Sequence, residues 1–109
     1  MKALWWLYVL ECRGGVLYTG IAKDVEARYA AHLRGAGAKF TRLNPPVRIL
    51  SRAALRTRGQ ALRAEYALKQ LERAEKLRWC TAGLEGFVAS RRFLAAPVRR
   101  LLRPADAKS

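Results

Sequence analysis

The clearest hydrophobic pattern is at the start of the chain, where two β-prone runs lie on either side of a short polar segment. The first run covers residues 4–10 and the second covers residues 16–21. The segment between them, residues 11–15, ends in two glycines, which is typical of the turn of a β-hairpin. The sequence therefore predicts two antiparallel strands at the beginning of the fold.

Alternation along the first of these strands assigns its side chains to two faces. Trp6, Tyr8 and Leu10 share one face, and Leu7 and Val9 share the other. Both faces are apolar, whereas a strand with one side in solvent usually alternates apolar with polar residues. We therefore expect this strand to be covered on both sides.

A change to four-residue spacing predicts a helix over residues 25–34. Asp24 is suited to cap the start of this helix, because a carboxylate accepts hydrogen bonds from the free N–H groups of a first turn. Gly35 is suited to follow its end. Arg28 and His32 are four residues apart, so their side chains share one face of the helix.

The pattern is weaker in the middle of the chain. Residues 35–42 are expected to form a flexible basic loop, and two prolines stop regular structure after it. A third strand is predicted over residues 47–52, with Val47, Ile49 and Ser51 on one face.

Two helices are predicted after this strand. Residues 57–71 carry an apolar stripe with Glu65 at its margin, and a short helix follows over residues 73–79. A break is expected near Gly83 and Gly86. Three β-prone runs and these helical patterns together predict an α+β fold, in which helices flank a three-stranded antiparallel sheet.

The charge of the chain indicates its partner. The sequence contains 22 Lys and Arg against 8 Asp and Glu, a formal net charge of +14 in 109 residues. A mixture of charges would serve solubility equally well, so this excess favours a polyanion such as DNA or RNA. A membrane surface is the lesser alternative. We expect residues 1–84 to form one domain and residues 85–109 to be a basic C-terminal extension.

Other sequence features exclude several classes of protein. No apolar run reaches the ~18 residues that a membrane-spanning helix needs. No cleavage site of the kind found in secretion signals follows the apolar start of the chain. Cys12 and Cys80 are too few for a disulfide framework and lack metal-ligand spacing. We therefore expect a cytoplasmic protein, with no sign of a stable protein partner.

Several short motifs resemble those of the GIY-YIG nuclease domain. Leu7-Tyr8-Val9 stands at the first motif and Tyr18-Thr19-Gly20 at the second. The resemblance is greatest to the small single-domain bacterial YhbQ-like (UPF0213-type) proteins, and it covers roughly residues 4–80. It extends through the further positions Arg28, His32, Gly35, Lys39-Phe40-Thr41, Pro46 and Glu65.

The resemblance implies a divalent-metal-dependent endonuclease that cleaves DNA of particular structure in repair or recombination. Tyr18 corresponds to the general base, and a phenol needs a nearby cation such as Arg28 to ionise at neutral pH. Arg28 would also clamp the scissile phosphate, and Tyr8 would position the water or that phosphate. His32 would assist Tyr18 or act as the base itself. Glu65 would be the sole protein ligand of Mg²⁺ or Mn²⁺.

Simpler interpretations exist for each residue taken alone. Tyrosines in strands usually pack, exposed arginines are usually solvated, and a lone histidine is usually a core or surface residue. Glu65 could be an ion-pair partner of Arg28 or Lys69. The ordered set of motif residues favours catalysis. The candidate nucleic-acid-binding residues beside the motifs are Lys23, Arg34, Lys39, Arg42 and Lys69.

The sequence departs from the family pattern at two positions. Several family members carry an asparagine after the glutamate, but the single asparagine here, Asn44, precedes the third strand. Many repair members carry a lysine directly after the second motif, where this chain has Ile21. The missing asparagine favours an alternative function, a non-catalytic or weakly catalytic nucleic-acid-binding accessory protein.

Overall fold

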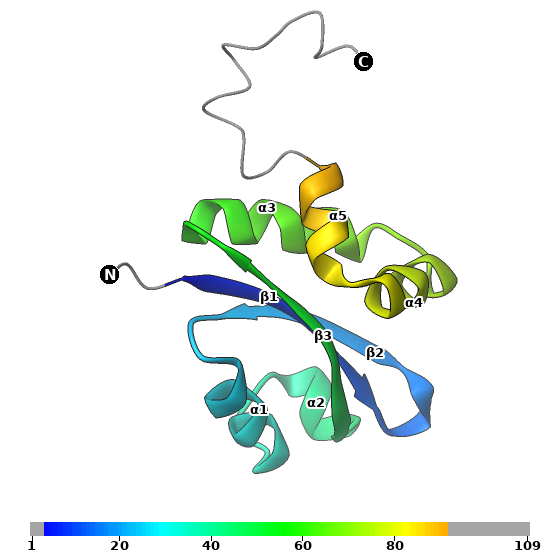
Figure 1. Ribbon diagram of the computed structural model, residues 1–109. Helices are drawn as coiled ribbons and strands as arrows, with labels where there is room; N and C mark the ends of the chain where they lie inside the picture. Colours follow the sequence, from blue (N-terminus) through cyan, green and yellow to red (C-terminus); the bar gives the residue numbers. More distant parts are fainter. Residues whose placement is uncertain (1–3, 92–109) are drawn as a thin grey trace, which may run out of the picture.

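A three-stranded antiparallel sheet forms the centre of the computed structural model, which describes residues 4–91 (Figure 1). The strands are β1 (Trp5–Cys12), β2 (Leu17–Ala22) and β3 (Pro46–Leu55). Their order is β2-β1-β3, so β1 is central and β2 is an edge strand. A short 3₁₀ turn, η1 (Arg13–Gly15), joins β1 to β2. The predicted α+β fold is confirmed.

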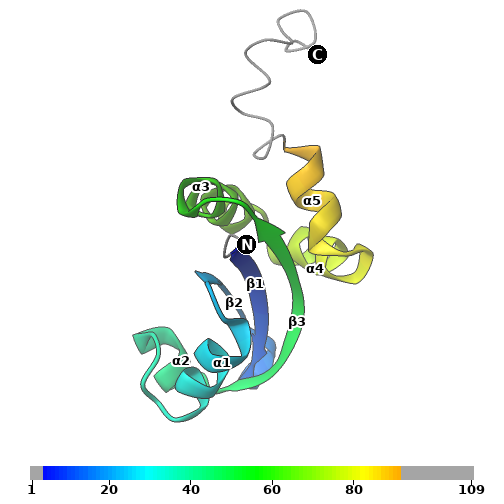
Figure 2. The ribbon, with the colours of Figure 1, turned by 60° about the vertical axis from the view of Figure 1, so that its left-hand side comes forward.

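Helices cover both faces of this sheet (Figures 1 and 2). The helices on one face are α1 (Val25–Leu33) and α2 (Lys39–Leu43). The helices on the other face are α3 (Arg58–Lys69), α4 (Arg73–Ala82) and α5 (Leu84–Ser90). No helix among residues 4–91 is both long and apolar enough to cross a membrane.

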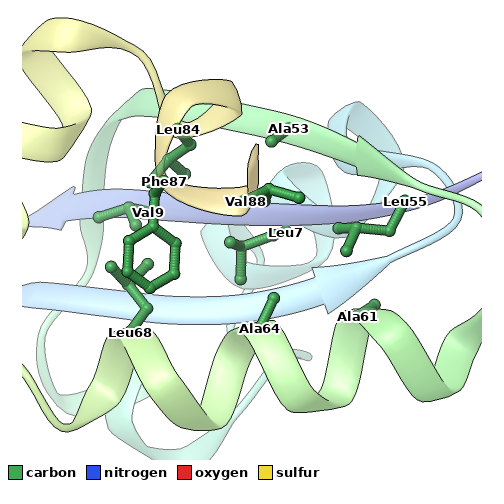
Figure 3. Packing of buried hydrophobic residues seen from close by; sticks show 10 residues of the cluster. All are labelled: Leu7, Val9, Ala53, Leu55, Ala61, Ala64, Leu68, Leu84, Phe87 and Val88. Atoms are coloured by element: carbon green, nitrogen blue, oxygen red, sulfur yellow. The ribbon is translucent and has the colours of Figure 1, made fainter. Parts of the chain in front are cut away.

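Two hydrophobic clusters lie on the two faces of β1, as its alternation predicts. Leu7 and Val9 pack with residues of α3 and α5, and Figure 3 labels the residues of this cluster. Tyr8 and Leu10 belong to the second cluster, on the face covered by α1. These four β1 side chains are at most 1% exposed. The central strand is therefore covered on both sides.

Side-chain caps explain where helices α1 and α3 begin. The Asp24 carboxylate accepts a hydrogen bond from the Ala27 N–H at 3.0 Å, which confirms the predicted cap of α1. Thr57 caps α3, where its hydroxyl accepts from the Gln60 N–H at 3.0 Å and the Gln60 side chain accepts from the Thr57 N–H. Each cap satisfies backbone donors that a helix leaves free in its first turn.

Three local expectations differ from the structure. The expected flexible loop over residues 35–42 contains the helix α2. The break expected near Gly86 is instead helix α5, because Phe87 and Val88 are buried in the core. The third strand extends to Leu55 rather than ending at residue 52. Residues 92–109 of the predicted basic extension lie outside the described residues.

Candidate active site

The pairing of β1 with β2 brings the two motif tyrosines onto one face of the sheet. Tyr8 lies opposite Gly20, and Leu10 lies opposite Tyr18. The two tyrosine rings are 6.3 Å apart between centroids. A Cβ atom on Gly20 would lie 2.6 Å from the Tyr8 hydroxyl oxygen and 3.0 Å from the Tyr18 ring. Gly20 thus leaves the space in which the two tyrosines sit.

Gly20→Ala should therefore destabilise the fold and displace both tyrosines. Overpacking of this kind typically costs about 1–3 kcal/mol of the free energy of unfolding. Gly59→Ala is the matched control, because its added Cβ meets nothing closer than 3.7 Å at the start of α3. Alanine favours a helix over glycine, so Gly59→Ala should leave the stability unchanged or raise it slightly. Equal denaturation midpoints for the two variants would contradict the packing described.

A buried chain of hydrogen bonds connects Tyr8 to the helices below the sheet. The Tyr8 hydroxyl lies 3.0 Å from Nε2 of His32, and Nδ1 of His32 lies 2.7 Å from Oγ1 of Thr41. The Thr41 hydroxyl donates to the Ala38 carbonyl at 2.9 Å. All three side chains in this chain are 1% exposed. Both ring nitrogens of His32 are therefore engaged inside the protein.

Burial sets the protonation states of this pair at neutral pH. Burial first, and the nearby Tyr18 second, raise the pKa of Tyr8 to about 12, although hydrogen bonding and charge from Arg28 oppose the rise. Burial, followed by the charge of Arg28, lowers the pKa of His32 below its usual value. Tyr8 is therefore a neutral phenol and His32 a neutral imidazole.

The depressed pKa of His32 predicts a loss of stability in mild acid. The unfolded chain takes up a proton near the ordinary histidine value of about 6.5, whereas the folded chain resists it. The stabilisation is fully present above that value and falls as the pH decreases toward the folded pKa. Melting temperatures measured from about pH 7.5 downward should fall for the parent and change less for His32→Gln. Identical slopes for the two proteins would disprove this, since His32 is the chain's single histidine.

The charges of Arg28 and Glu65, which lie on different helices, both affect the pKa of Tyr8. Arg28 is on α1, and Glu65 is on α3. The Glu65 side chain is 19% exposed, and its carboxylate forms an ion pair with Lys69 at 3.1 Å. The simpler interpretation of Glu65 as an ion-pair partner is thus correct for Lys69, whereas no ion pair joins it to Arg28 in the described part of the chain.

A pocket of about 270 Å³ opens at the outer edge of β2, where α2, α3 and α4 meet it. Its lining residues are Leu17, Tyr18, Thr19, Phe40, Lys69 and Lys76. The Phe40 ring is stacked on the Tyr18 ring at 5.9 Å between centroids. The motif resemblance includes Phe40 but assigns it no role, and no sequence pattern indicated Lys76. The pocket depends on the packing of α2 and α4.

The remaining predicted nucleic-acid-binding residues are all exposed. Lys39 and Arg42 lie on α2, near the pocket residue Phe40, and Arg34 caps the end of α1. Lys23 lies apart from them, with its ammonium 5.4 Å from the centroid of the Trp5 ring. The structure thus gathers the catalytic candidates at one place and distributes the basic candidates more widely.

The donor set of the site limits the kind of metal that could bind. Among residues 4–91, no three acidic, histidine or cysteine side chains lie close enough together to hold an ion. Glu65 supplies one carboxylate beside the pocket. Mg²⁺ suits such a site, because it retains several waters and needs only one or two carboxylates together with substrate phosphates. The residues therefore fit a weakly held hard cation and not a zinc centre.

Sequence comparisons place this chain among known proteins. A UPF0213 protein of Xanthomonas axonopodis pv. citri is 54% identical over 78 residues, which cover 72% of this chain and 76% of that protein. A UPF0213 protein of Cupriavidus pinatubonensis is 47% identical over 76 residues, covering 70% of this chain and 84% of that protein.

A solved structure and a family model extend the comparison. The solution NMR structure of a UPF0213 protein from Bacillus halodurans has 32% sequence identity and a TM-score of 0.49, covering 82% of this chain and 95% of that chain. The model of the GIY-YIG catalytic domain matches residues 4–78. These residues contain both tyrosine motifs, Arg28, His32 and Glu65. The chain belongs to the GIY-YIG catalytic domain family, a nuclease family.

Proposed function

We propose that this protein is a divalent-metal-dependent endonuclease that hydrolyses phosphodiester bonds in DNA. The observation that carries the proposal is the convergence of charge and chemistry at Tyr8. The Tyr18 ring, the His32 imidazole and the charges of Arg28 and Glu65 all act on this buried residue, although they come from three different elements. A fold alone would not require these groups to meet at one edge of the sheet.

Tyr18 is the group that we assign as general base. Its hydroxyl has no hydrogen-bond partner among residues 4–91, and the residue lines the pocket at the edge of β2. A water in this pocket could therefore be held by the Tyr18 oxygen and lose a proton to it as the water attacks phosphorus. His32 is a poorer candidate, because it is 1% exposed and both its ring nitrogens are hydrogen-bonded.

Tyr8 and Arg28 prepare the site for this attack. Tyr8 keeps its proton, given a pKa of about 12, so it positions other groups rather than accepting a proton. Arg28 is exposed on α1 and carries a guanidinium fork that can bind two phosphate oxygens. Its positive charge would stabilise the negative charge that develops on the phosphate in the transition state.

Glu65 is the residue that would hold the metal, which we propose to be Mg²⁺ or Mn²⁺. When bound, such an ion neutralises phosphate charge and polarises the phosphoryl oxygens. The Lys69 ammonium is paired with the Glu65 carboxylate, so a metal would have to displace it. The Lys69 side chain is 51% exposed, so its ammonium can turn into solvent where a metal takes its place.

The substrate that we propose is DNA recognised by shape and backbone. The net charge of +14 suits phosphate contacts, with Lys23, Arg34, Lys39, Arg42 and Lys69 as the contacting residues. The sequence contains no recognised base-reading module, so branched or nicked DNA of repair or recombination in the cytoplasm is the proposed target.

The decisive experiment incubates the full chain with branched, nicked and single-stranded DNA, with and without Mg²⁺ or Mn²⁺. We expect metal-dependent cleavage of at least one DNA. Binding of DNA without any cleavage would support the accessory function instead.

One feature favours this second function: the asparagine that family members carry after the glutamate is missing. The single asparagine of this chain, Asn44, lies at the end of α2, where its amide donates to the Phe40 carbonyl at 3.1 Å. The affinity for DNA should fall steeply with salt in either case.

A further inference from the structure

We propose that Thr41 is a positioning residue that fixes the tautomer of His32 and, through it, the direction of the Tyr8 hydroxyl. In this arrangement His32 carries its proton on Nδ1, and the Tyr8 O–H donates to the free Nε2. The assignment of hydrogens rests on the geometry alone, whereas its consequence for catalysis rests on the proposed function.

The Thr41 end of the chain gives the first step. A hydroxyl has a single proton, and that of Thr41 is directed to the Ala38 carbonyl at 2.9 Å. Toward Nδ1 of His32, at 2.7 Å, Thr41 can then act only as an acceptor. Nδ1 must therefore carry the proton, and a neutral imidazole leaves Nε2 as an acceptor.

The Tyr8 end supports the same direction independently. Arg28 interacts with the Tyr8 hydroxyl, and a guanidinium can only donate. In any hydrogen bond between these two groups the Tyr8 oxygen is the acceptor, which leaves the Tyr8 proton free for another partner. Among residues 4–91, Nε2 of His32, at 3.0 Å, is the acceptor within reach. The opposite direction would leave the proton of a hydroxyl that is 1% exposed without an acceptor, which is costly in a protein interior.

Local packing holds the imidazole in this orientation. A Cβ atom on Gly37 would overlap Nδ1 of His32, so the chain passes against the ring at that point. Helix α2 has only five residues, and no side chain caps its start. The buried Thr41 is its main attachment to His32, since the exposed Phe40 contacts Tyr18 instead. Helix α2 thus places a hydroxyl acceptor beside Nδ1.

The consequence for catalysis concerns the oxygen of Tyr8. With its proton on the side of His32, this oxygen keeps its lone pairs available to the guanidinium of Arg28, whose charge and hydrogen bonding already oppose the rise in the pKa of Tyr8. In the other tautomer, Nε2–H would donate to the Tyr8 oxygen. The Tyr8 proton would then point away from His32, toward the side of the oxygen that the Arg28 guanidinium approaches. Thr41 therefore maintains the arrangement in which Tyr8 orients the guanidinium that binds phosphate.

Nitrogen NMR of the imidazole tests the tautomer directly. The chain has one histidine, so long-range ¹H–¹⁵N correlations need no assignment. The parent should show a protonated Nδ1 and an unprotonated Nε2. Thr41→Val should shift the ring toward the other tautomer, whereas Thr41→Ser keeps the hydroxyl and should show the parent tautomer. Thr81→Val, a change at an exposed threonine, should leave the parent spectrum unchanged. A parent spectrum with a protonated Nε2 would overturn the proposal, even if Thr41→Val failed to fold.

Cleavage kinetics test the positioning role separately. Thr41→Val should lower kcat by roughly 10–100-fold, the range typical of residues that orient a catalytic group, with KM for DNA little changed. Thr41→Ser should recover most of this loss. A Thr41→Val protein with the altered tautomer and the parent kcat would refute the role in catalysis. If the parent does not cleave any DNA, the proposed function fails, and the nitrogen spectrum still decides how Thr41 acts on His32.

Discussion

Glu65→Gln should abolish metal-dependent cleavage while the protein remains folded and still binds DNA. A metal ligand must be an ionised carboxylate to attract a hard cation, and its amide isostere is a poor substitute. The loss should exceed about 100-fold, because even residues that merely orient metal ligands account for 10–100-fold. DNA binding without metal should hold or strengthen, since one negative charge leaves a basic pocket. Single-turnover cleavage, metal-free binding and melting temperature measure these three effects on one preparation.

Two further variants separate the metal role from the ion pair. Glu11→Gln makes the same chemical change in a carboxylate that pairs with Arg48 at 2.7 Å elsewhere, and it should not affect cleavage. Lys69→Met breaks the same pair as Glu65→Gln but leaves the carboxylate in place. It should weaken DNA binding and retain metal-dependent cleavage at saturating DNA. If Lys69→Met reproduces the loss seen in Glu65→Gln, the ion pair and not the metal explains the role of Glu65.

Local patterns were sufficient to predict most of the fold. Alternation along β1 assigned Tyr8 and Leu7 to opposite faces, and these residues lie in different hydrophobic clusters. The capping residue Asp24 fixed the start of α1. These features are encoded by neighbours in the sequence, so no knowledge of distant contacts was needed.

Elements stabilised by distant contacts could not be predicted in this way. Residues 35–42 contain two glycines, and they precede two prolines, which are features of a loop. Helix α2 forms there nevertheless, with Thr41 buried against His32 and Phe40 stacked on Tyr18. Similarly, burial of Phe87 outweighs the cost of about 1 kcal/mol that a glycine adds inside helix α5.

An irregularity in the sheet explains why the predicted side-chain faces of β3 were wrong. The sequence predicts Ile49 and Ser51 on one face of β3 because they are two residues apart. In the structure Leu10 pairs with Ile49 and Val9 pairs with Ser51, which leaves Leu50 as an extra residue in β3. Such a bulge reverses the alternation, so Ser51 faces α5 and its hydroxyl accepts from the Leu84 N–H at 3.2 Å.

In the candidate site, too, local patterns predicted some features and distant contacts determined the others. The motif spacing identified the tyrosines, and the sheet register indeed places them on one face. The burial of His32 could not be predicted from the sequence, because it depends on the packing of α2 and on the space left by Gly37. That burial matters most for the proposed mechanism, because it favours Tyr18 over His32, the two candidate bases that motif spacing alone left open.

Tyr18→Phe should accordingly be the more damaging of two base-removing substitutions. Phenylalanine keeps the ring that stacks on Phe40 and removes only the hydroxyl, which has no partner among residues 4–91. Stability and DNA binding should therefore be unchanged, while loss of a general base lowers the cleavage rate by roughly 10²–10⁴-fold.

His32→Gln should behave differently, because it removes a buried hydrogen-bonding partner of both Tyr8 and Thr41. An unsatisfied buried donor or acceptor costs about 1–3 kcal/mol, so this variant should lose stability. It should nevertheless retain measurable cleavage per folded molecule, since Tyr18 still faces the pocket. Comparing single-turnover rates, corrected for the folded fraction, ranks the two residues. A Tyr18→Phe protein that cuts faster than His32→Gln would move the base to His32, and would require the imidazole to leave its hydrogen bonds before it reaches water.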